Sequence, residues 1–492
     1  MVKKDEVVIG SKEERVLIEK TKKISIKEAS AYSFMDGFGL RYVTPYALAT
    51  GASNTQIALL SSVPGLVGSL SQLFTFRAMK KWPRKNIIRW SVFLQALMWI
   101  FMIAAGIPFF LWGMKTSFSS NAIVVIYILL ILAGAFAGPA WSSLMRDLVS
   151  KNRGEYFGLR NRIAGTVALV CMFVAGFLLD YFKKTHVFLG FAVLFFVAFV
   201  GRFISSYLFT KHYDPKFTPD DKKYFTIFDF IKKMRYNNFG RFVLYFSTFS
   251  LAVAVASPFF SVFYLKNLGF SYTQYMITAI ANSVSAIIFM PLWGKFADRY
   301  GNLKVMKING FLIPFLPLFY LPIIFIHTSF WILFVVLLVE IYSGFIWAGF
   351  NLAAGNFIYD AVSRERLSIC TSYFNILNAF GSLFGALLGG YLASQNFQFF
   401  GLTGLLFVFL IGGIARFAVH FIFFDGIEEV REVRGFSVRR HLKERTIRLY
   451  LETKRLFRSA LRSVSMNKFF DAMVSESEHL YSSNPNNLLN NN

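Results

Sequence analysis

Long stretches without a charged residue are the feature that most limits what this chain can fold into. There are 35 residues free of Asp, Glu, Lys and Arg between Arg41 and Arg77, and 49 between Arg366 and Arg416. A helix of roughly 20 apolar residues crosses the hydrocarbon core of a bilayer. Period-2 alternation of polar and apolar residues is absent, so helices must satisfy the backbone hydrogen bonds. We therefore predict an all-α polytopic membrane protein, since a composition of 55% hydrophobic residues excludes a water-soluble domain.

Twelve transmembrane helices fit these apolar stretches. We place the spans at 28–50, 55–77, 88–113, 122–147, 162–182, 186–210, 241–265, 273–297, 305–327, 329–358, 366–395 and 399–424. The first 27 residues carry mixed charge, so we expect a cytoplasmic N-terminal segment (1–27) and no cleaved signal. Beyond it we expect a six-helix bundle (28–210), a cytoplasmic linker (211–240), a second bundle (241–424) and a basic cytoplasmic tail (425–492), amphipathic and then disordered.

The basic residues lie almost entirely on one side of this predicted topology. The chain has 52 Lys and Arg against 27 Asp and Glu, and 45 of the 52 fall on the side that carries both termini. Basic residues concentrate on the cytoplasmic side of membrane proteins, so both termini are predicted to be cytoplasmic in a multi-pass protein of the cell membrane. Topology and attraction to anionic lipids at the cytoplasmic face account for this charge, and we expect no nucleic-acid partner.

The two cysteines indicate neither a disulfide framework nor a metal site. Cys171 and Cys370 both fall within predicted spans, and no cysteine lies in a loop. We therefore expect no metal, no cofactor and no catalytic residue of the thiol or zinc kind.

An internal repeat divides the chain into two halves. The link GASNTQI from Gly51 matches GFSYTQY from Gly269, and DLVSKNR from Asp147 matches DAVSRER from Asp360. The two offsets are 218 and 213 residues, so the matches occur in one order with nearly one spacing. Parallel repeats of six spans are typical of proteins in which a central site lies between two bundles that rock about it.

One loop carries a recognisable motif. The segment GKFADRYGNLK, between the eighth and ninth predicted spans, resembles the signature loop of the major facilitator superfamily (MFS) through Gly294, Asp298, Arg299 and Gly301. The loops after the fourth and tenth spans resemble that family's equivalent loops. Their candidate gating residues are Asp147, Arg153, Asp360 and Arg366.

This resemblance implies the MFS fold and a transporter, in which the Asp and Arg of the signature loop latch helix ends in one state of the cycle. The first-half copy departs from the motif, because Lys80 stands where Asp298 does and Pro83 stands where Gly301 does. The latch is therefore assigned only to Asp298 and Arg299, with a topology-setting basic loop as the alternative. Proton-driven drug exporters of the family carry an Arg in span 4 and a Gly-Pro pair in span 5. This chain has neither, which disfavours drug export.

Charged residues inside the spans need a pairing, a water-lined cavity or a route to the interface. Arg202 and Arg416 are equivalent in the repeat and lie late in their spans. We expect their guanidinium groups to reach the inner headgroups, with His420 at the same interface. Such symmetric residues suit a scaffold role.

Asp36, Arg41 and Glu340 have no charged equivalent in the other half, so they suit an asymmetric task. Glu340 lies near the middle of its span and begins a stripe at helical spacing, which predicts the lining of a substrate cavity. The stripe continues through Ser343, Trp347 and Asn351. Asp36 and Arg41 would not share a face of a straight helix, but Gly37 and Gly39 favour a bent one.

Two ion pairs involving Arg41 stay open at this point: one with Asp36 and one with Glu340. Arg41 is either a counter-ion or an anchor for an anionic substrate. Proton coupling requires a carboxyl group whose ionisation follows its access to water, and Asp36 and Glu340 are the candidates.

The sequence thus predicts a monomeric secondary active transporter that moves a small solute by alternating access, as a symporter or an antiporter, with proton coupling as one option. A polytopic membrane enzyme acting on lipid-linked substrates is the alternative from another class. It is disfavoured because the predicted outer links are short and contain almost no carboxylate except Asp180. A channel is a third, weaker alternative, because no filter-like loop is repeated.

Overall fold

A computed structural model describes residues 12–149, 153–215, 226–363, 366–395, 398–399 and 402–433. Residues Met1–Glu432 form one compact unit and Val433–Asn492 a second one. The elements below all belong to the first unit. The predicted amphipathic tail and its disordered end lie outside the described residues, apart from the stretch up to Val433, and so does the middle of the predicted linker.

The first half contains five long helices after a broken one. Its elements are α1 (Lys12–Phe34), a π-helical turn η1 (Met35–Gly39), a 3-10 turn η2 (Leu40–Tyr42), α2 (Val43–Ala49), α3 (Asn54–Met79), α4 (Arg84–Phe110), α5 (Phe118–Leu148), α6 (Arg153–Lys183) and α7 (Val187–Thr210). A short helix α8 (Ile227–Lys233) and a 3-10 turn η3 (Met234–Tyr236) follow in the linker.

The second half repeats this order. Its elements are α9 (Asn238–Ala256), α10 (Phe259–Val262), a π-helical turn η4 (Phe263–Asn267), α11 (Tyr272–Tyr300), α12 (Asn302–Leu312), α13 (Phe315–Leu318), a 3-10 turn η5 (Leu321–Phe325), α14 (Ser329–Ala361), α15 (Leu367–Ser394) and α16 (Leu405–Phe423). Two-residue strands β1 (Gln398–Phe399) and β2 (Leu402–Thr403) pair antiparallel between α15 and α16. This small hairpin is the one departure from the predicted all-α fold in the described part of the chain.

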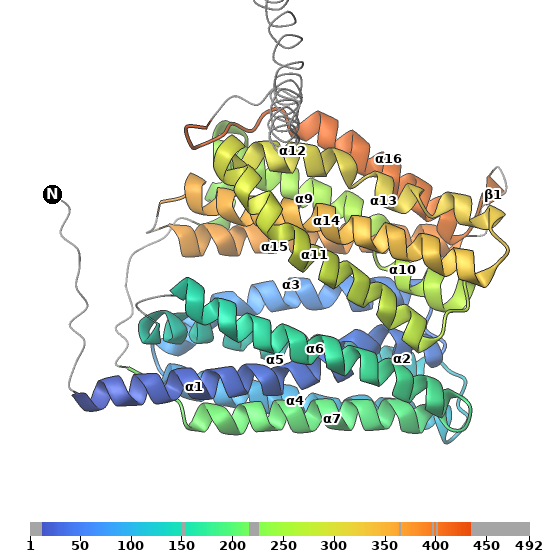
Figure 1. The fold of residues 1–492 in the computed structure, drawn as a ribbon, viewed down its shortest axis with the longest axis horizontal. Coiled ribbons are helices and arrows are strands. Elements are labelled where there is room, and N and C mark those ends of the chain that lie inside the picture. Colours follow the sequence, from blue (N-terminus) through green and yellow to red (C-terminus); the bar gives the residue numbers. More distant parts are fainter. Residues whose placement is uncertain are drawn as a thin grey trace, which may run out of the picture. The chain divides into compact units, whose positions relative to one another are not determined.

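Eleven helices of the described part are long and apolar enough to cross a membrane. The predicted first span, 28–50, falls on the broken segment from α1 to α2, which supplies the twelfth crossing of the predicted fold. Figure 1 shows α1–α7 on one side and α9–α16 on the other. The halves contact each other through α3 against α15 and through α6 against α11.

The repeated links have the same local structure in both halves. Gly51 and Gly269 adopt positive φ angles of 81° and 66°, which L side chains rarely adopt. Two residues later, Ser53 and Ser271 each form a reciprocal capping box with the Gln three positions on. The repeat motif is therefore a helix start, which confirms the two six-helix repeats.

Three glycines bring α15 directly against α9. A Cβ atom added at Gly381, Gly385 or Gly389 would collide with a backbone carbonyl oxygen of α9, from Ser247, Leu251 and Val255 respectively. Small residues at this spacing let transmembrane helices approach closely.

We expect Gly385→Val to separate these two helices and to lower stability by roughly 1–3 kcal/mol, the usual cost of overpacking a core. The measurement is thermal unfolding of purified protein in detergent. Gly355→Val is the matched control, because a Cβ there meets no atom within 4 Å. An equal change in both variants would show that the contact contributes nothing specific.

Candidate functional site

The break in the first span brings Asp36 and Arg41 together. Gly37 and Gly39 pack so closely on neighbouring helices that a Cβ would collide with Cys171 and Trp99, respectively. The π-helical turn η1 changes the angle between positions 36 and 41, and Arg41 Nε lies 3.6 Å from Asp36 Oδ1. The Arg41 side chain is 48% exposed and that of Asp36 24%. Of the two pairings left open by the sequence, the structure forms the one between Asp36 and Arg41.

Glu340 is held by polar side chains from three other segments of the second half. The Tyr264 hydroxyl donates to Glu340 Oε1 at 2.6 Å, and the Tyr320 hydroxyl lies 3.3 Å from the same oxygen. Asn282 Nδ2 donates to Glu340 Oε2 and to Ser343 Oγ, both at 2.9 Å. We call these five residues the Glu340 cluster. Every described partner donates to the carboxylate, so its oxygens are satisfied as acceptors.

The rest of the predicted stripe faces a different space. Trp347 and Asn351 line a pocket of about 360 Å³ in the second half, together with Ser250 and Asn378. The Ser250 hydroxyl donates to Asn378 Oδ1 at 3.4 Å. Aromatic rings supply much of the remaining wall: Phe246, Phe249, Phe350 and Phe374. No charged side chain is among the described residues that line it. The residues of the stripe therefore lie in two different sites: Glu340 and Ser343 in the Glu340 cluster, and Trp347 and Asn351 in this aromatic–amide pocket.

Tyrosines extend from the Glu340 cluster to the start of α11. Tyr275 of α11 hydrogen bonds to Ser261 at 3.0 Å, and its ring lies 6.3 Å from that of Tyr264 in the Glu340 cluster. The described contacts include no ion pair between Arg41 and Glu340.

The halves are fastened at the end of the bundle that carries the links 50–53 and 268–271, which we call the distal end. Asp180, at the end of α6, accepts hydrogen bonds from the backbone N–H groups of Tyr272 and Thr273, both at 2.8 Å. These are unsatisfied donors at the start of α11, where a carboxylate is stabilised by the helix dipole. Figure 1 shows α11 descending toward α6 at this point.

A second distal contact joins α3 and α15. Asn54 Nδ2 donates to the carbonyl of Ala393 at 2.8 Å, and Lys266 Nζ donates to the carbonyl of Ala52 at 3.3 Å. Sequence reasoning noted Asp180 only as an isolated outer carboxylate and missed these contacts, because they depend on how the halves dock.

At the opposite end, which we call the terminal end because α1 begins and α16 finishes there, two predicted gating residues pair within their own halves. Asp147 Oδ2 accepts from Arg84 Nη1 at 2.6 Å. Asp360 Oδ2 accepts from Asn302 Nδ2 at 2.8 Å and lies 3.0 Å from Arg431 Nε. Arg84 and Asn302 are equivalent in the repeat, so the same position binds the same carboxylate in both halves.

The two residues of the predicted latch in the signature loop lie at the surface. Asp298 and Arg299 are both exposed, and Arg299 lies over the Tyr300 ring at 5.1 Å. Gly301 has a φ of 96°, and a Cβ there would collide with Glu429, which accepts from the backbone N–H of Leu303 at 2.8 Å. This glycine is required by the sharp start of α12.

The other predicted gating residues have varied surroundings. A Cβ at Gly294 would make only an ordinary contact with Leu352, so this glycine is not required by packing. Arg366 is exposed at the start of α15. Arg153 begins α6, but its side chain lies outside the described part of the chain.

The prediction that Arg202 and Arg416 reach the headgroups is wrong. Both are buried, 6% and 1% exposed. Arg202 Nε donates to Gln95 Oε1 at 2.6 Å, and its Nη1 lies 3.7 Å from Glu28 Oε1. Arg416 instead donates to the Val253 carbonyl at 3.0 Å. Both guanidinium groups therefore find hydrogen-bond acceptors inside the protein and do not extend to the membrane interface.

Two neighbouring predictions are corrected by the same packing. His420 is 3% exposed and hydrogen bonds to the Tyr245 hydroxyl at 3.1 Å, so it lies in the core and not at the interface. Glu28, which also binds Arg160 at 3.0 Å, was missed because it stands at the first position of a predicted span. The sequence feature that could have identified Glu28 is a carboxylate beside an apolar stretch that also contains Asp36.

Two six-helix repeats, fastened at one end and carrying buried polar clusters, define a polytopic membrane protein of the transporter type. The chain belongs to the Major Facilitator Superfamily, whose family model matches residues 29–358. This confirms the predicted family, and the similar proteins found are transporters and not enzymes.

The similar proteins differ in what they carry. The multi-drug resistance efflux pump PmrA of Streptococcus pneumoniae serotype 4 (strain ATCC BAA-334 / TIGR4) is 30% identical over 166 residues, which are 33% of this chain and 38% of that protein. The match therefore spans less than two fifths of the length of this curated relative.

Among solved structures, the nucleoside transporter NupG is 15% identical, with a TM-score of 0.61 over 83% of this chain and 98% of that one. A bacterial homologue of the iron transporter ferroportin, in an inward-facing state, is 14% identical, with a TM-score of 0.59 over 83% and 98% of the two chains. At these identities the likeness shows the fold alone.

Proposed function

We propose that this chain is a secondary active transporter that moves a small solute across the cell membrane by alternating access of two six-helix halves. The observation that carries the proposal is the closure between the halves at the distal end, through Asp180 and Asn54. Polar groups that could bind a solute or a proton lie between this closure and the terminal end. A repeat-based transporter exposes such a site to each side in turn by rocking one half against the other.

The proposed orientation places the terminal end, with both termini, in the cytoplasm. The support is the excess of Lys and Arg on that side. Protons and anionic lipids of the cytoplasmic leaflet are the proposed partners besides the solute, and the proposed state is a monomer.

The aromatic–amide pocket supports a neutral solute with a planar ring. The Trp347 indole offers a stacking surface, and the amides of Asn351 and Asn378 offer both donors and acceptors. A volume of about 360 Å³ suits a molecule of one or two rings. The pairing of Arg41 with Asp36 favours its role as a counter-ion over an anchor for an anionic substrate.

Counterflow in reconstituted vesicles tests the transport proposal. Vesicles preloaded with unlabelled nucleosides, nucleobases or planar amphiphilic compounds should accumulate the labelled compound, with saturation. Neither an enzyme nor a channel produces counterflow, so its absence with every compound of this class, in protein that remains folded, would contradict the proposal. A thermal-shift screen identifies the compounds to try, because a bound ligand raises the apparent stability.

Asp180→Ala is expected to weaken the distal closure. It removes the charged acceptor of two hydrogen bonds, each worth about 1.5–3 kcal/mol. The state in which the two halves are separated at the distal end should therefore become at least about tenfold more populated. A cysteine introduced at Ser261, which lies in α10 and hydrogen bonds to Tyr275 of α11, should then react faster with a membrane-impermeant thiol reagent added outside. Lys184→Ala, an exposed change four residues away, is the control. Equal labelling in both variants would argue against a gating role for Asp180.

A further inference from the structure

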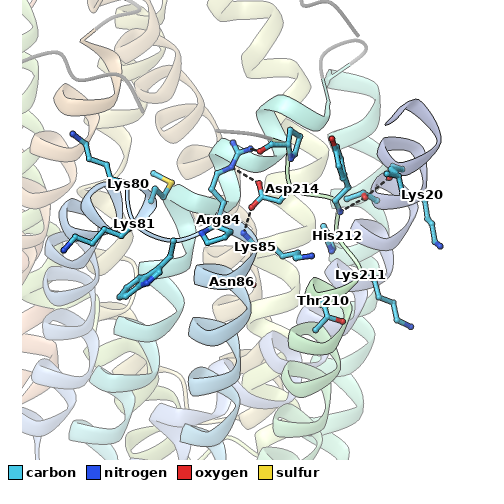
Figure 2. A pocket seen from close by; sticks show the side chains of 17 residues that line it. Lys20, Lys80, Lys81, Arg84, Lys85, Asn86, Thr210, Lys211, His212 and Asp214 are labelled. Carbon is cyan, nitrogen blue, oxygen red and sulfur yellow. Dashed lines mark hydrogen bonds and ion pairs between the residues drawn. The ribbon is translucent and has the colours of Figure 1, made fainter. Parts of the chain in front are cut away.

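A strongly basic pocket of about 980 Å³ lies at the terminal end of the first half, outside the proposed transport pathway (Figure 2). It is formed by α1, the end of α3, the start of α4 and the residues that follow α7. Six cationic side chains line it: Lys20, Lys80, Lys81, Arg84, Lys85 and Lys211. The described lining contains a single carboxylate, that of Asp214.

That carboxylate does not neutralise the lysines. Asp214 Oδ1 accepts from Arg84 Nε at 3.1 Å, and its Oδ2 accepts from the backbone N–H of Lys85 at 2.9 Å. Figure 2 shows these bonds at the top of α4. Asp214 is therefore committed to Arg84 and to the start of the helix, and no ion pair is described for Lys81, Lys85 or Lys211.

His212 gives the pocket a buried acceptor. The side chain is 2% exposed and packs on the Phe209 ring at 4.8 Å. Its Nδ1 lies 3.0 Å from the Leu208 carbonyl, so the proton of the neutral ring is on Nδ1. Burial lowers the pKa of His212, which favours this neutral form. Nε2 is then a buried lone pair without a hydrogen-bond partner in the described structure, which a hydroxyl group would satisfy.

The edge of the pocket is apolar. Trp82 and Leu17 line it and are 62% and 43% exposed. Exposed tryptophan is enriched at membrane–water interfaces, where its ring lies at the level of the headgroups. A ligand held here would have its charged part among the lysines and an apolar part beside Trp82.

We infer that this pocket binds the headgroup of an anionic phospholipid that carries a hydroxyl group near its phosphate, such as phosphatidylglycerol. The phosphate binds the lysines, and the hydroxyl donates to His212 Nε2. The inference rests on the proposed orientation, which places this pocket at the cytoplasmic leaflet. A soluble phosphate ester of a polyol shares the same chemistry, and the apolar edge favours the lipid.

Native mass spectrometry of the full-length protein in detergent, titrated with phospholipids, tests this inference. We expect phosphatidylglycerol to bind at least tenfold more tightly than phosphatidylcholine. The triple variant Lys81→Gln, Lys85→Gln, Lys211→Gln should weaken binding by about a hundredfold, because each basic residue near a lipid surface contributes about 1 kcal/mol. The matched control has the same charge change at Lys232, Lys233 and Lys295, which are exposed and outside the pocket.

The histidine is tested separately with phosphatidylmethanol, which has the same charge as phosphatidylglycerol but no hydroxyl in its headgroup. Wild-type protein should prefer phosphatidylglycerol, and His212→Phe, which keeps an aromatic ring against Phe209, should remove that preference. Equal weakening in the two triple variants, or equal binding of phosphatidylcholine, would overturn the inference. Tighter binding of free glycerol phosphate than of the lipid would show that the ligand of the pocket is a soluble phosphate ester and not a lipid. Because binding is measured without transport, failed counterflow with intact lipid binding would contradict the proposed function alone.

Discussion

Glu340→Gln is expected to reduce uptake driven by a pH gradient to the level of empty vesicles, while counterflow continues. Counterflow requires only that the loaded protein alternates, whereas a pH gradient can drive transport only through a group that binds and releases a proton. Glutamine keeps the size of the side chain and an oxygen that accepts from Tyr264, but it cannot titrate. The measurement is labelled-solute uptake in reconstituted vesicles, with and without an imposed gradient.

The cluster around Glu340 supports this expectation. A mid-membrane carboxylate is expensive unless it is paired or hydrogen bonded, and here Tyr264, Tyr320 and Asn282 supply the bonds. These partners come from separate segments, so a rearrangement of the second half would change how the carboxylate is satisfied. Coupling of protonation to conformation requires such a change.

Glu432→Gln is the matched control, because Glu432 is an exposed carboxylate outside the helices. It should leave both modes of transport unchanged. Gradient-driven uptake that survives in Glu340→Gln would exclude this residue as the coupling site. Asp36→Asn would then be the next variant to measure, and loss of counterflow in Glu340→Gln would instead assign Glu340 to solute binding or to the conformational change.

The fold was predictable because hydrophobic length and repetition are properties of the sequence itself. Uncharged stretches define spans whatever their partners, and the matching links at Gly51 and Gly269 are helix starts that need the same glycine and the same capping box in each half. The stripe from Glu340 to Asn351 was predictable to the extent that helical spacing fixes a face. The division of this stripe between the Glu340 cluster and the aromatic–amide pocket could not be predicted, because that division depends on Asn282 and on the aromatic residues of α9.

Contacts that depend on an irregular backbone, or on how helices pack against one another, could not be predicted from the sequence. A straight helix separates Asp36 from Arg41, and the π-helical turn η1 together with the 3-10 turn η2, which contains Arg41, brings them to 3.6 Å. The position of Arg202 late in its span suggested the interface, but Glu28 and Gln95 on other helices hold it in the core. Long-range partners of this kind leave no periodic signal in the sequence.

Arg202→Met is expected to destabilise the protein by about 3–5 kcal/mol, whereas Arg416→Met should change its stability by about 1 kcal/mol or less. The two arginines occupy equivalent positions of the repeat, but their partners differ. Glu28 and Gln95 are both buried, and each loses its contact with the guanidinium group when Arg202 is removed. Among the described contacts, removal of Arg416 leaves only backbone carbonyls without their donor, including that of Val253, which accepts at 3.0 Å. The measurement is thermal unfolding in detergent, in which Arg202→Met should lower the melting temperature by about 5–10 °C.

A double variant separates the loss of the arginine from the charge that it leaves behind. Glu28→Gln combined with Arg202→Met removes both charges, so it should be more stable than Arg202→Met alone. The recovery should be partial, because Glu28 also binds Arg160 at 3.0 Å and that contact is weakened too. If Arg202→Met and Arg416→Met were equally destabilising, the cost would come from the lost side-chain packing that the two sites share, and the carboxylate at Glu28 would have no special role. A large difference that the double variant reduces would show that one half of the repeat binds a buried charge which the other half lacks.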